Sequence, residues 1–168
     1  MIKILFVCHG NICRSPMAEY ILKDMTARTG RAAEFVMKDL VQKAGCADEW
    51  EIASAAVSRE EIGNPVHPGT RERLRREGIS TEGKWAVQMT REDYERYDWL
   101  IGMDTSNLRW MQRITGGDPH HKMSRLLEWT GENRDVADPW YTGDFEQTYR
   151  DIDRGCRALL EKAKGMEK

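Results

Sequence analysis

This sequence lacks long apolar runs and any large excess of charge of one sign. None of its hydrophobic stretches approaches the roughly 20 consecutive apolar residues that a membrane-spanning helix needs. Its 26 basic and 28 acidic side chains give a net charge of −2, so there is no general electrostatic attraction to nucleic acid or to acidic membranes. We therefore expect no nucleic-acid partner and no membrane partner.

Cysteine is also scarce, with four in 168 residues. Cys8, His9 and Cys13 lack the second spaced pair of ligands that a zinc site requires, so we expect no metal and no other cofactor. The apolar run at residues 2–7 has no small-residue cleavage site after it, and we interpret it as a strand and not as a signal peptide. These features indicate reduced thiols and a cytoplasmic protein.

The remaining composition is that of a folded chain. Hydrophobic residues make up 40% and charged residues 32%, which excludes wholesale disorder, and the length suits a single domain over residues 1–168. Strands that alternate with helices predict an α/β domain with a parallel sheet. The predicted strands are residues 2–7, 50–55, 98–103 and 122–127, and the main predicted helices are residues 16–22, 68–77, 105–114 and 145–163.

One helical segment is duplicated around residues 18–40. The letters AEYILKDM at residues 18–25 recur as AEFVMKDL at residues 33–40. In one continuous helix the second apolar stripe would point about 60° away from the first, whereas a break at Thr29-Gly30 would let the second copy fold back. We favour an arrangement in which the second copy protrudes or is exchanged, and we expect a homodimer through this segment.

The most informative segment is residues 7–16, Val-Cys-His-Gly-Asn-Ile-Cys-Arg-Ser-Pro, which follows the first predicted strand and opens a helix. In such a loop successive backbone N–H groups point to one centre and the helix N-terminus adds its positive end, so an anion such as phosphate can bind. The same field favours a thiolate at Cys8, and Arg14 can place its planar guanidinium on two phosphate oxygens.

Other residues of the segment support this phosphate-binding interpretation. Gly10 permits a backbone turn that other residues resist, Asn11 can brace the loop, and Ser15 can donate its hydroxyl to the thiolate. A purely structural interpretation, with a buried cysteine and a helix-capping serine, does not explain why all these features occur in this order. The candidate phosphate-binding residues are His9, Gly10, Asn11, Ile12, Cys13 and Ser15.

At these residues the sequence resembles the low-molecular-weight protein tyrosine phosphatases, whose signature contains a cysteine, five residues, an arginine and then a serine or threonine. The resemblance extends over most of the chain, including residues 54–58, 90–93, 103–108 and the Asp-Pro at 138–139, and it fails over the duplication. It implies a single three-layer domain in which helices cover both faces of a four-stranded parallel sheet. It also implies hydrolysis of phosphotyrosine in a protein, or of a small aryl phosphate, through a phosphocysteine intermediate.

The resemblance also assigns residues near the C-terminus. It implies that Asp138 is the general acid and base, while Asp135 and Asp144 are nearby competitors for that role. It implies that the aromatic rings of Trp140 and Tyr141 form a wall of the substrate cleft.

Two departures from the family pattern bear on specificity and on the loop. Where the family often has an aromatic residue on the opposite wall, this chain has Arg59-Glu60-Glu61, which we expect to weaken phosphotyrosine binding or to favour basic flanking residues. The family's bracing histidine falls in the segment Glu82-Gly83-Lys84, so Asn11 is expected to rely on Ser54.

Several alternatives remain open from the sequence. A phosphoarginine phosphatase on the same fold is disfavoured because its smaller hydroxylated residue is replaced by Ile12. An arsenate reductase needs further redox cysteines, and none lies between Cys46 and Cys156. A non-catalytic phosphate-binding regulatory module is the third alternative. Cys13 is either a partner for a reversible disulfide with Cys8 or a buried thiol without a role.

Overall fold

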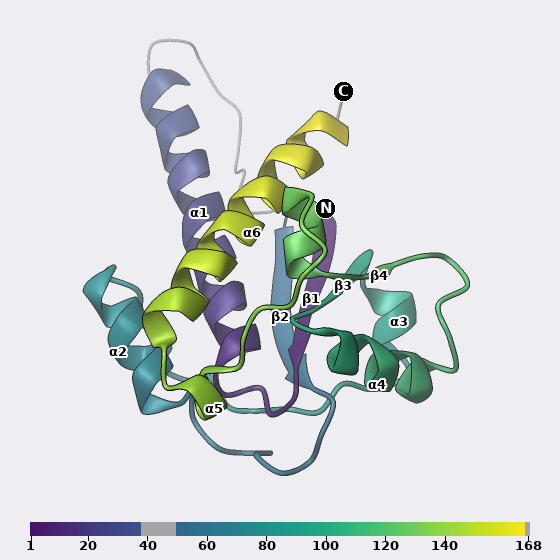
Figure 1. The fold of residues 1–168 in the computed structure, drawn as a ribbon. Helices are drawn as coiled ribbons and strands as arrows, with labels where there is room; N and C mark the ends of the chain where they lie inside the picture. Colours follow the sequence, from purple (N-terminus) through teal and green to yellow (C-terminus); the bar gives the residue numbers. More distant parts are fainter. Residues whose placement is uncertain (38–49, 167–168) are drawn as a thin grey trace.

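The computed structural model describes residues 1–37 and 50–166, and a parallel sheet lies at its centre. The sheet has four strands in the order β2–β1–β3–β4 (Figure 1). The strands are β1 (Ile2–Cys8), β2 (Trp50–Ala56), β3 (Trp99–Gly102) and β4 (Met123–Arg125). Each differs from the predicted strand by a few terminal residues at most.

Strand β1 is central because both of its faces are apolar. Ile4 and Phe6 point into one buried cluster, and Leu5 and Val7 point into another on the opposite face. This alternation follows from the two-residue period of a strand, and burial on both sides is typical of parallel sheets. The same run places Cys8 at the carboxyl end of the strand, opposite Ala56 of β2.

Helices cover both faces of the sheet, so the predicted layered α/β fold is confirmed (Figure 1). The long helices α1 (Arg14–Met37) and α6 (Phe145–Met166) lie side by side on one face, with α2 (Pro68–Arg76) next to them. On the other face lie α3 (Asp93–Arg96) and α4 (Thr105–Thr115). A 3-10 turn (Leu126–Thr130) and α5 (Pro139–Thr142) connect β4 to α6.

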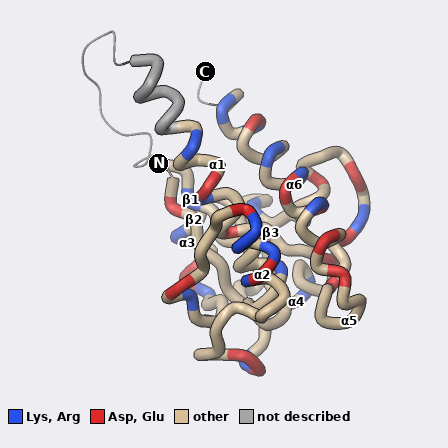
Figure 2. The backbone as a smooth tube through the Cα atoms, turned by 90° about the vertical axis from the view of Figure 1, so that its left-hand side faces the viewer, with Lys and Arg blue, Asp and Glu red and all other residues tan. Residues whose placement is uncertain are grey.

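The carboxyl ends of the parallel strands meet at one edge of the sheet, as right-handed connections require. The loops after β1, β2 and β3 therefore converge there. Basic and acidic residues are interspersed along α6 (Figure 2), in keeping with the small net charge of the chain. None of the helices in the described part of the chain is long and apolar enough to cross a membrane.

Helix α1 runs without interruption through Thr29 and Gly30 to Met37, so the alternative of a break at this point is wrong. Pro16 lies in the first turn of α1, where a missing N–H costs nothing. The end of the second copy, residues 38–40, lies outside the described residues. The assignment of one domain to residues 1–168 stays a prediction.

Candidate active site

The loop between β1 and α1 forms a tight cradle around the Cys8 thiol. Asn11 has a φ of 58°, which is the left-handed conformation, and its backbone N–H points to Cys8 Sγ at 3.3 Å. Gly10 does not have a positive φ, so the expectation that it provides the unusual turn is wrong. A Cβ at Gly10 would instead come within 3.1 Å of Glu61 Cγ, so the glycine leaves room for the neighbouring loop.

Asn11 holds its strained conformation through its side chain. Its amide nitrogen donates to Ser15 Oγ and to Ser54 Oγ, both at 2.9 Å, and its amide oxygen accepts from the backbone N–H of Val87 at 3.1 Å. The contact with Ser54 agrees with the expectation from the sequence. These bonds tie the loop to β2 and to the segment after α2.

The Cys8 thiol lies at the bottom of the cradle and is 3% exposed. Ser15 Oγ is 3.0 Å from Cys8 Sγ, and it already accepts a hydrogen bond from Asn11. Its own hydroxyl proton is therefore free to point to the sulfur, with the carbonyl of Ala55 at 3.4 Å as the competing acceptor. A thiolate at Cys8 would receive hydrogen bonds from Ser15 and from the Asn11 backbone.

Arg14 joins its own loop to two distant segments. Its guanidinium donates to Asp104 at 2.8 Å, to the Val136 carbonyl at 2.9 Å and to Asp138 at 3.3 Å. Burial opposes the charge, but the nearby Cys8, Asp138 and Asp104 outweigh it and raise the pKa of Arg14 above its ordinary value. The cation is fixed in one orientation beside the thiol.

Asp104 is a site residue that the sequence analysis did not single out. It follows β3, caps α4 by accepting from the Asn107 backbone at 2.7 Å, and holds Arg14 with its other oxygen. The available signal was an acid directly after a buried strand, followed three residues later by an asparagine that completes a capping box.

Asp138 is positioned by the start of α5. One carboxylate oxygen accepts from the Trp140 backbone at 3.1 Å, and the other faces Arg14. The competitors point elsewhere: Asp135 pairs with Arg125 at 3.0 Å, and Asp144 caps the first turn of α6. Of the three acids, only Asp138 lines the cleft that contains Cys8.

The cleft above Cys8 has a volume of about 110 Å³. Trp140 and Tyr141 form one wall and are 58% and 83% exposed, so both rings are available to a substrate. Glu60 and Glu61 also line the cleft, and Glu60 contacts His9 at 2.9 Å. The remaining lining residues come from the loop and its helix: Cys8, His9, Gly10, Ile12, Cys13 and Arg14.

Behind the loop lies a buried group of charges that the sequence analysis missed. Glu19 is 4% exposed and accepts from the Ser54 hydroxyl at 2.5 Å. Lys84 pairs with Glu19 at 3.1 Å and donates to the Ser54 carbonyl at 3.0 Å. Lys84 belongs to the segment Glu82-Gly83-Lys84, which lacks the histidine that braces Asn11 in the family. Lys84 nevertheless supports Asn11 indirectly, through Glu19 and Ser54.

Cys13 faces the same cleft but differs from Cys8 in its chemistry. Burial, with smaller contributions from Cys8 and Asp138, raises the pKa of Cys13 to about 12. It therefore stays a thiol at neutral pH, and Cys8, Cys13 and Cys156 are all unpaired. Within residues 1–37 and 50–166, no group of three or more possible metal ligands is present.

Comparison with known proteins gives consistent matches. A sequence model described as "Low molecular weight phosphotyrosine protein phosphatase" matches residues 3–32 and 29–168, and the two matches overlap at the duplication. The chain is 40% identical to the low molecular weight protein-tyrosine-phosphatase YfkJ of Bacillus subtilis over 162 residues, 95% of this chain and 94% of that protein. The crystal structure of YfkJ superposes with a TM-score of 0.87 and 38% identity, covering 100% of this chain and 98% of the other. The human low molecular weight phosphotyrosine protein phosphatase is 36% identical over 165 residues, 95% of this chain and 94% of that protein.

Proposed function

The chain belongs to the low molecular weight phosphotyrosine protein phosphatase family and is a protein tyrosine phosphatase, and we propose that Cys8, Arg14 and Asp138 carry out its chemistry. The observation that carries this assignment is that Cys8 and Arg14, from the loop after β1, share a single cleft with Asp138, which lies 124 residues after Arg14 in the sequence. The Arg14 guanidinium and the Asp138 carboxyl group line the same cleft as the Cys8 thiol, which Ser15 and the Asn11 backbone N–H already face.

In the first step the Cys8 thiolate attacks the phosphorus, a sulfur–phosphorus bond forms, and the bond to the aryl oxygen breaks. Asp138 in its acid form gives its proton to the departing oxygen, because a neutral phenol is a better leaving group than a phenolate anion. Arg14 binds two of the phosphoryl oxygens with its planar guanidinium, while the loop N–H groups bind the phosphoryl group. The product that remains bound is phosphocysteine.

In the second step the ionised Asp138 takes a proton from a water molecule that attacks the phosphorus. The sulfur–phosphorus bond breaks, inorganic phosphate leaves, and Cys8 returns to its thiolate form. Ser15, at 3.0 Å from the sulfur, supports this step by donating to the departing thiolate. Asp104 keeps Arg14 in place throughout and touches neither reactant.

The cleft supports an aryl ester as the substrate. Trp140 and Tyr141 offer exposed rings against which a phosphotyrosine ring packs, and Ile12 contributes an apolar surface where a phosphoarginine enzyme would have a smaller hydroxylated residue. Glu60 and Glu61 at the mouth give it negative charge, and we propose that basic residues next to the phosphotyrosine are favoured.

The test is a comparison of substrates with purified protein in a reductant and a metal chelator. We expect hydrolysis of an aryl phosphate and of phosphotyrosine peptides, inhibition by vanadate, and little activity on phosphoserine or phosphoarginine. The Cys8→Ser variant should bind anions without turnover, because a hydroxyl is far less acidic than a thiol. Turnover by Cys8→Ser, or a preference for phosphoarginine, would contradict the assignment.

Two further properties are proposals of the same kind. A cytoplasmic location is supported by the unpaired thiols Cys8, Cys13 and Cys156, which suit a reducing compartment. A homodimer through the duplicated segment is supported by the unbroken course of α1, which carries residues 33–37 of the second copy beyond the end of the sheet (Figure 1).

A further inference from the structure

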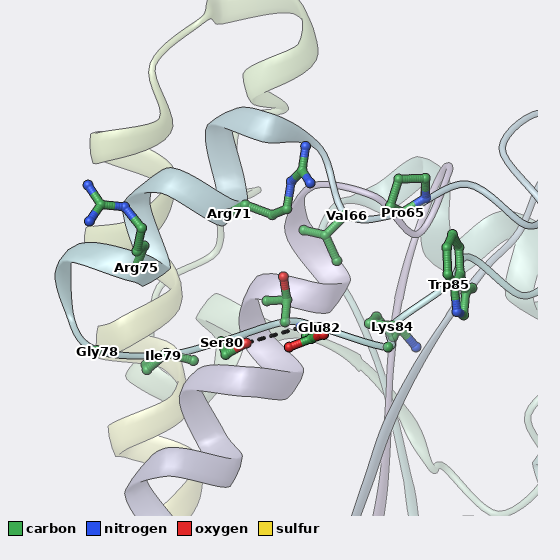
Figure 3. Close-up of a pocket in the computed structure, with 12 residues that line it drawn as sticks. Pro65, Val66, Arg71, Arg75, Gly78, Ile79, Ser80, Glu82, Lys84 and Trp85 are labelled. Atoms are coloured by element: carbon green, nitrogen blue, oxygen red, sulfur yellow. Dashed lines mark hydrogen bonds between the residues drawn. The ribbon is translucent and has the colours of Figure 1, made fainter.

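A second hollow lies near the proposed active site, between α2 and residues 78–85 (Figure 3). Its volume is about 580 Å³, several times that of the catalytic cleft. The apolar side chains that line it are Pro65, Val66, Ile79 and Trp85. The charged lining residues are Arg71, Arg75, Glu82 and Lys84, of which Arg75 pairs with Glu72 at 2.9 Å and Lys84 pairs with Glu19 at 3.1 Å.

A path of exposed apolar side chains connects this pocket to the catalytic cleft. Trp85 and Val87 are 56% and 49% exposed and alternate with the buried Ala86, so they share one face of an extended segment. Ile62, 51% exposed, lies on the neighbouring segment. The two segments are joined by backbone hydrogen bonds of 2.9 Å between Ala86 and both Gly63 and Asn64.

The path lies between the catalytic cleft at one end and the pocket at the other. Glu61 lines the catalytic cleft and is four residues from Pro65, which lines the pocket. An extended chain advances at most ~3.5 Å per residue, so the two ends are no more than about 14 Å apart along this segment. The backbone N–H of Val87 donates to the buried side chain of Asn11 at 3.1 Å, so the segment that carries the path is also held to the phosphate loop.

We propose that this pocket and path are a docking surface for the polypeptide that carries the phosphotyrosine. A substrate chain in extended conformation would place a bulky apolar side chain, within about four residues of the phosphotyrosine, against Trp85 in the pocket. This inference rests on the proposed phosphatase activity and extends it from the phosphorylated residue to its flanking sequence. Exposed apolar surface that is continuous with a binding cleft is typical of such recognition.

The decisive experiment compares matched phosphotyrosine peptides with Trp85→Ser. Two pairs of peptides are used, and the varied positions lie two to four residues from the phosphotyrosine. These positions are on its N-terminal side in one pair and on its C-terminal side in the other. Within each pair, one peptide carries leucine at these positions and the other carries serine. We expect the wild type to prefer one leucine peptide by about tenfold in kcat/KM, and Trp85→Ser to remove that preference. Hydrolysis of a small aryl phosphate should change by less than about twofold, because that substrate does not reach the pocket.

Trp110→Ser is the matched control, since Trp110 on α4 is 47% exposed and lines neither the cleft nor the pocket. It should keep the leucine preference.

A wild type that does not distinguish the peptides, with normal aryl phosphate turnover, would overturn the docking surface and leave the proposed activity intact. An equal loss on all substrates would assign Trp85 a structural role. A Trp85→Ser variant that turns a dimer into a monomer with unchanged preference would show that a second copy covers the pocket. No turnover of aryl phosphate would reject both proposals.

Discussion

Lys84 and Glu19 form an ion pair of 3.1 Å directly behind the phosphate loop, with side chains that are 12% and 5% exposed. The carboxylate of Glu19 accepts from the Ser54 hydroxyl, so Ser54 can only accept from Asn11. The buried carboxylate of Glu19 therefore fixes which group donates and which accepts in each hydrogen bond from Glu19 through Ser54 to Asn11. In this way the ion pair between Lys84 and Glu19, which lies outside the cleft, helps to hold Asn11 and the phosphate loop in place.

Replacement of Lys84 by methionine should therefore weaken both the fold and the reaction. A buried carboxylate that loses its partner normally costs ~3–5 kcal/mol, and the second cation, Lys23 at 2.6 Å, should reduce this to about half. We expect a fall in the unfolding free energy, measured by urea denaturation, and a fall in kcat of about tenfold with little change in KM.

Lys84→Arg is the matched variant because it keeps the positive charge. It should recover most of the kcat lost in Lys84→Met. If Lys84→Met is destabilised but turns over at the wild-type rate, the ion pair supports only the fold and does not position Asn11.

Asp138→Ala should lower turnover of phenyl phosphate by about 10²–10⁴, the usual contribution of general acid–base catalysis. The loss should become smaller as the leaving group becomes more acidic, because such a phenolate departs without a proton. The measurement is kcat for a series of substituted aryl phosphates. A loss that is the same for every leaving group would assign Asp138 to holding Arg14, which it contacts at 3.3 Å.

Cys13 should protect Cys8 from irreversible oxidation. Peroxide converts the Cys8 thiolate to a sulfenic acid, and the Cys13 thiol can then form a disulfide with it, releasing water. The raised pKa of Cys13, about 12, keeps the attacking group mostly protonated, so disulfide formation should become faster as the pH rises. The measurement is the activity recovered with dithiothreitol after mild peroxide. Equal recovery by Cys13→Ser would show that Cys13 has no protective role.

The stability of the protein should fall in alkaline solution because of its buried thiols. Burial raises the pKa of Cys156 above its ordinary 9.0, so the unfolded chain releases this proton at a lower pH than the folded one. Below pH 9 the contribution to stability is complete, and above it the unfolding free energy should fall by up to ~1.4 kcal/mol per pH unit for a fully buried thiol.

Urea denaturation between pH 8 and pH 10.5 measures this slope. Cys156→Ala is less stable at every pH because it leaves a small cavity, but its slope should be shallower than that of the wild type. Parallel curves for the two proteins would rule out Cys156 as the source of the pH dependence.

Local patterns in the sequence were sufficient to predict an α/β domain with a parallel sheet and to single out Cys8 as the proposed nucleophile. The strand at residues 2–7 is apolar on both faces, and Cys8 and Arg14 belong to one continuous segment, so no tertiary information was needed for either. The partners of Arg14 and Asn11 come from other strands and loops. Asp104 reaches Arg14 because β3 lies beside β1, and Glu19 and Lys84 reach Asn11 indirectly through Ser54 of β2, contacts that no local pattern encodes.

Helix α1 illustrates a different limit. The sequence analysis predicted a helix at residues 16–22 and left open whether Thr29-Gly30 ends it, because glycine weakens a helix by ~1 kcal/mol relative to alanine. The observed helix continues to Met37. The flanking residues are good helix formers, and their summed preference outweighs one glycine.

The duplication leads to the last prediction, a deletion that restores a single copy. Removal of residues 20–34 joins Glu19 directly to Phe35 and keeps the eight-residue pattern of the first copy. The core positions now filled by Ile21 and Leu22, which are 2% and 0% exposed, would be filled by Val36 and Met37. These are near-conservative exchanges, which normally cost less than ~1.5 kcal/mol each.

We therefore expect the shortened protein to fold and to hydrolyse aryl phosphate at close to the wild-type rate, since Cys8, Arg14, Ser15 and Glu19 are retained. The full chain should form a dimer that depends on concentration, and the shortened chain should remain a monomer, because the second apolar stripe is the surface that a second subunit would cover. Sedimentation velocity over a hundredfold range of concentration separates the two. Monomers for both proteins at the highest concentration would exclude the dimer, whereas loss of activity in a folded, shortened monomer would mean that the second copy supports the phosphate loop.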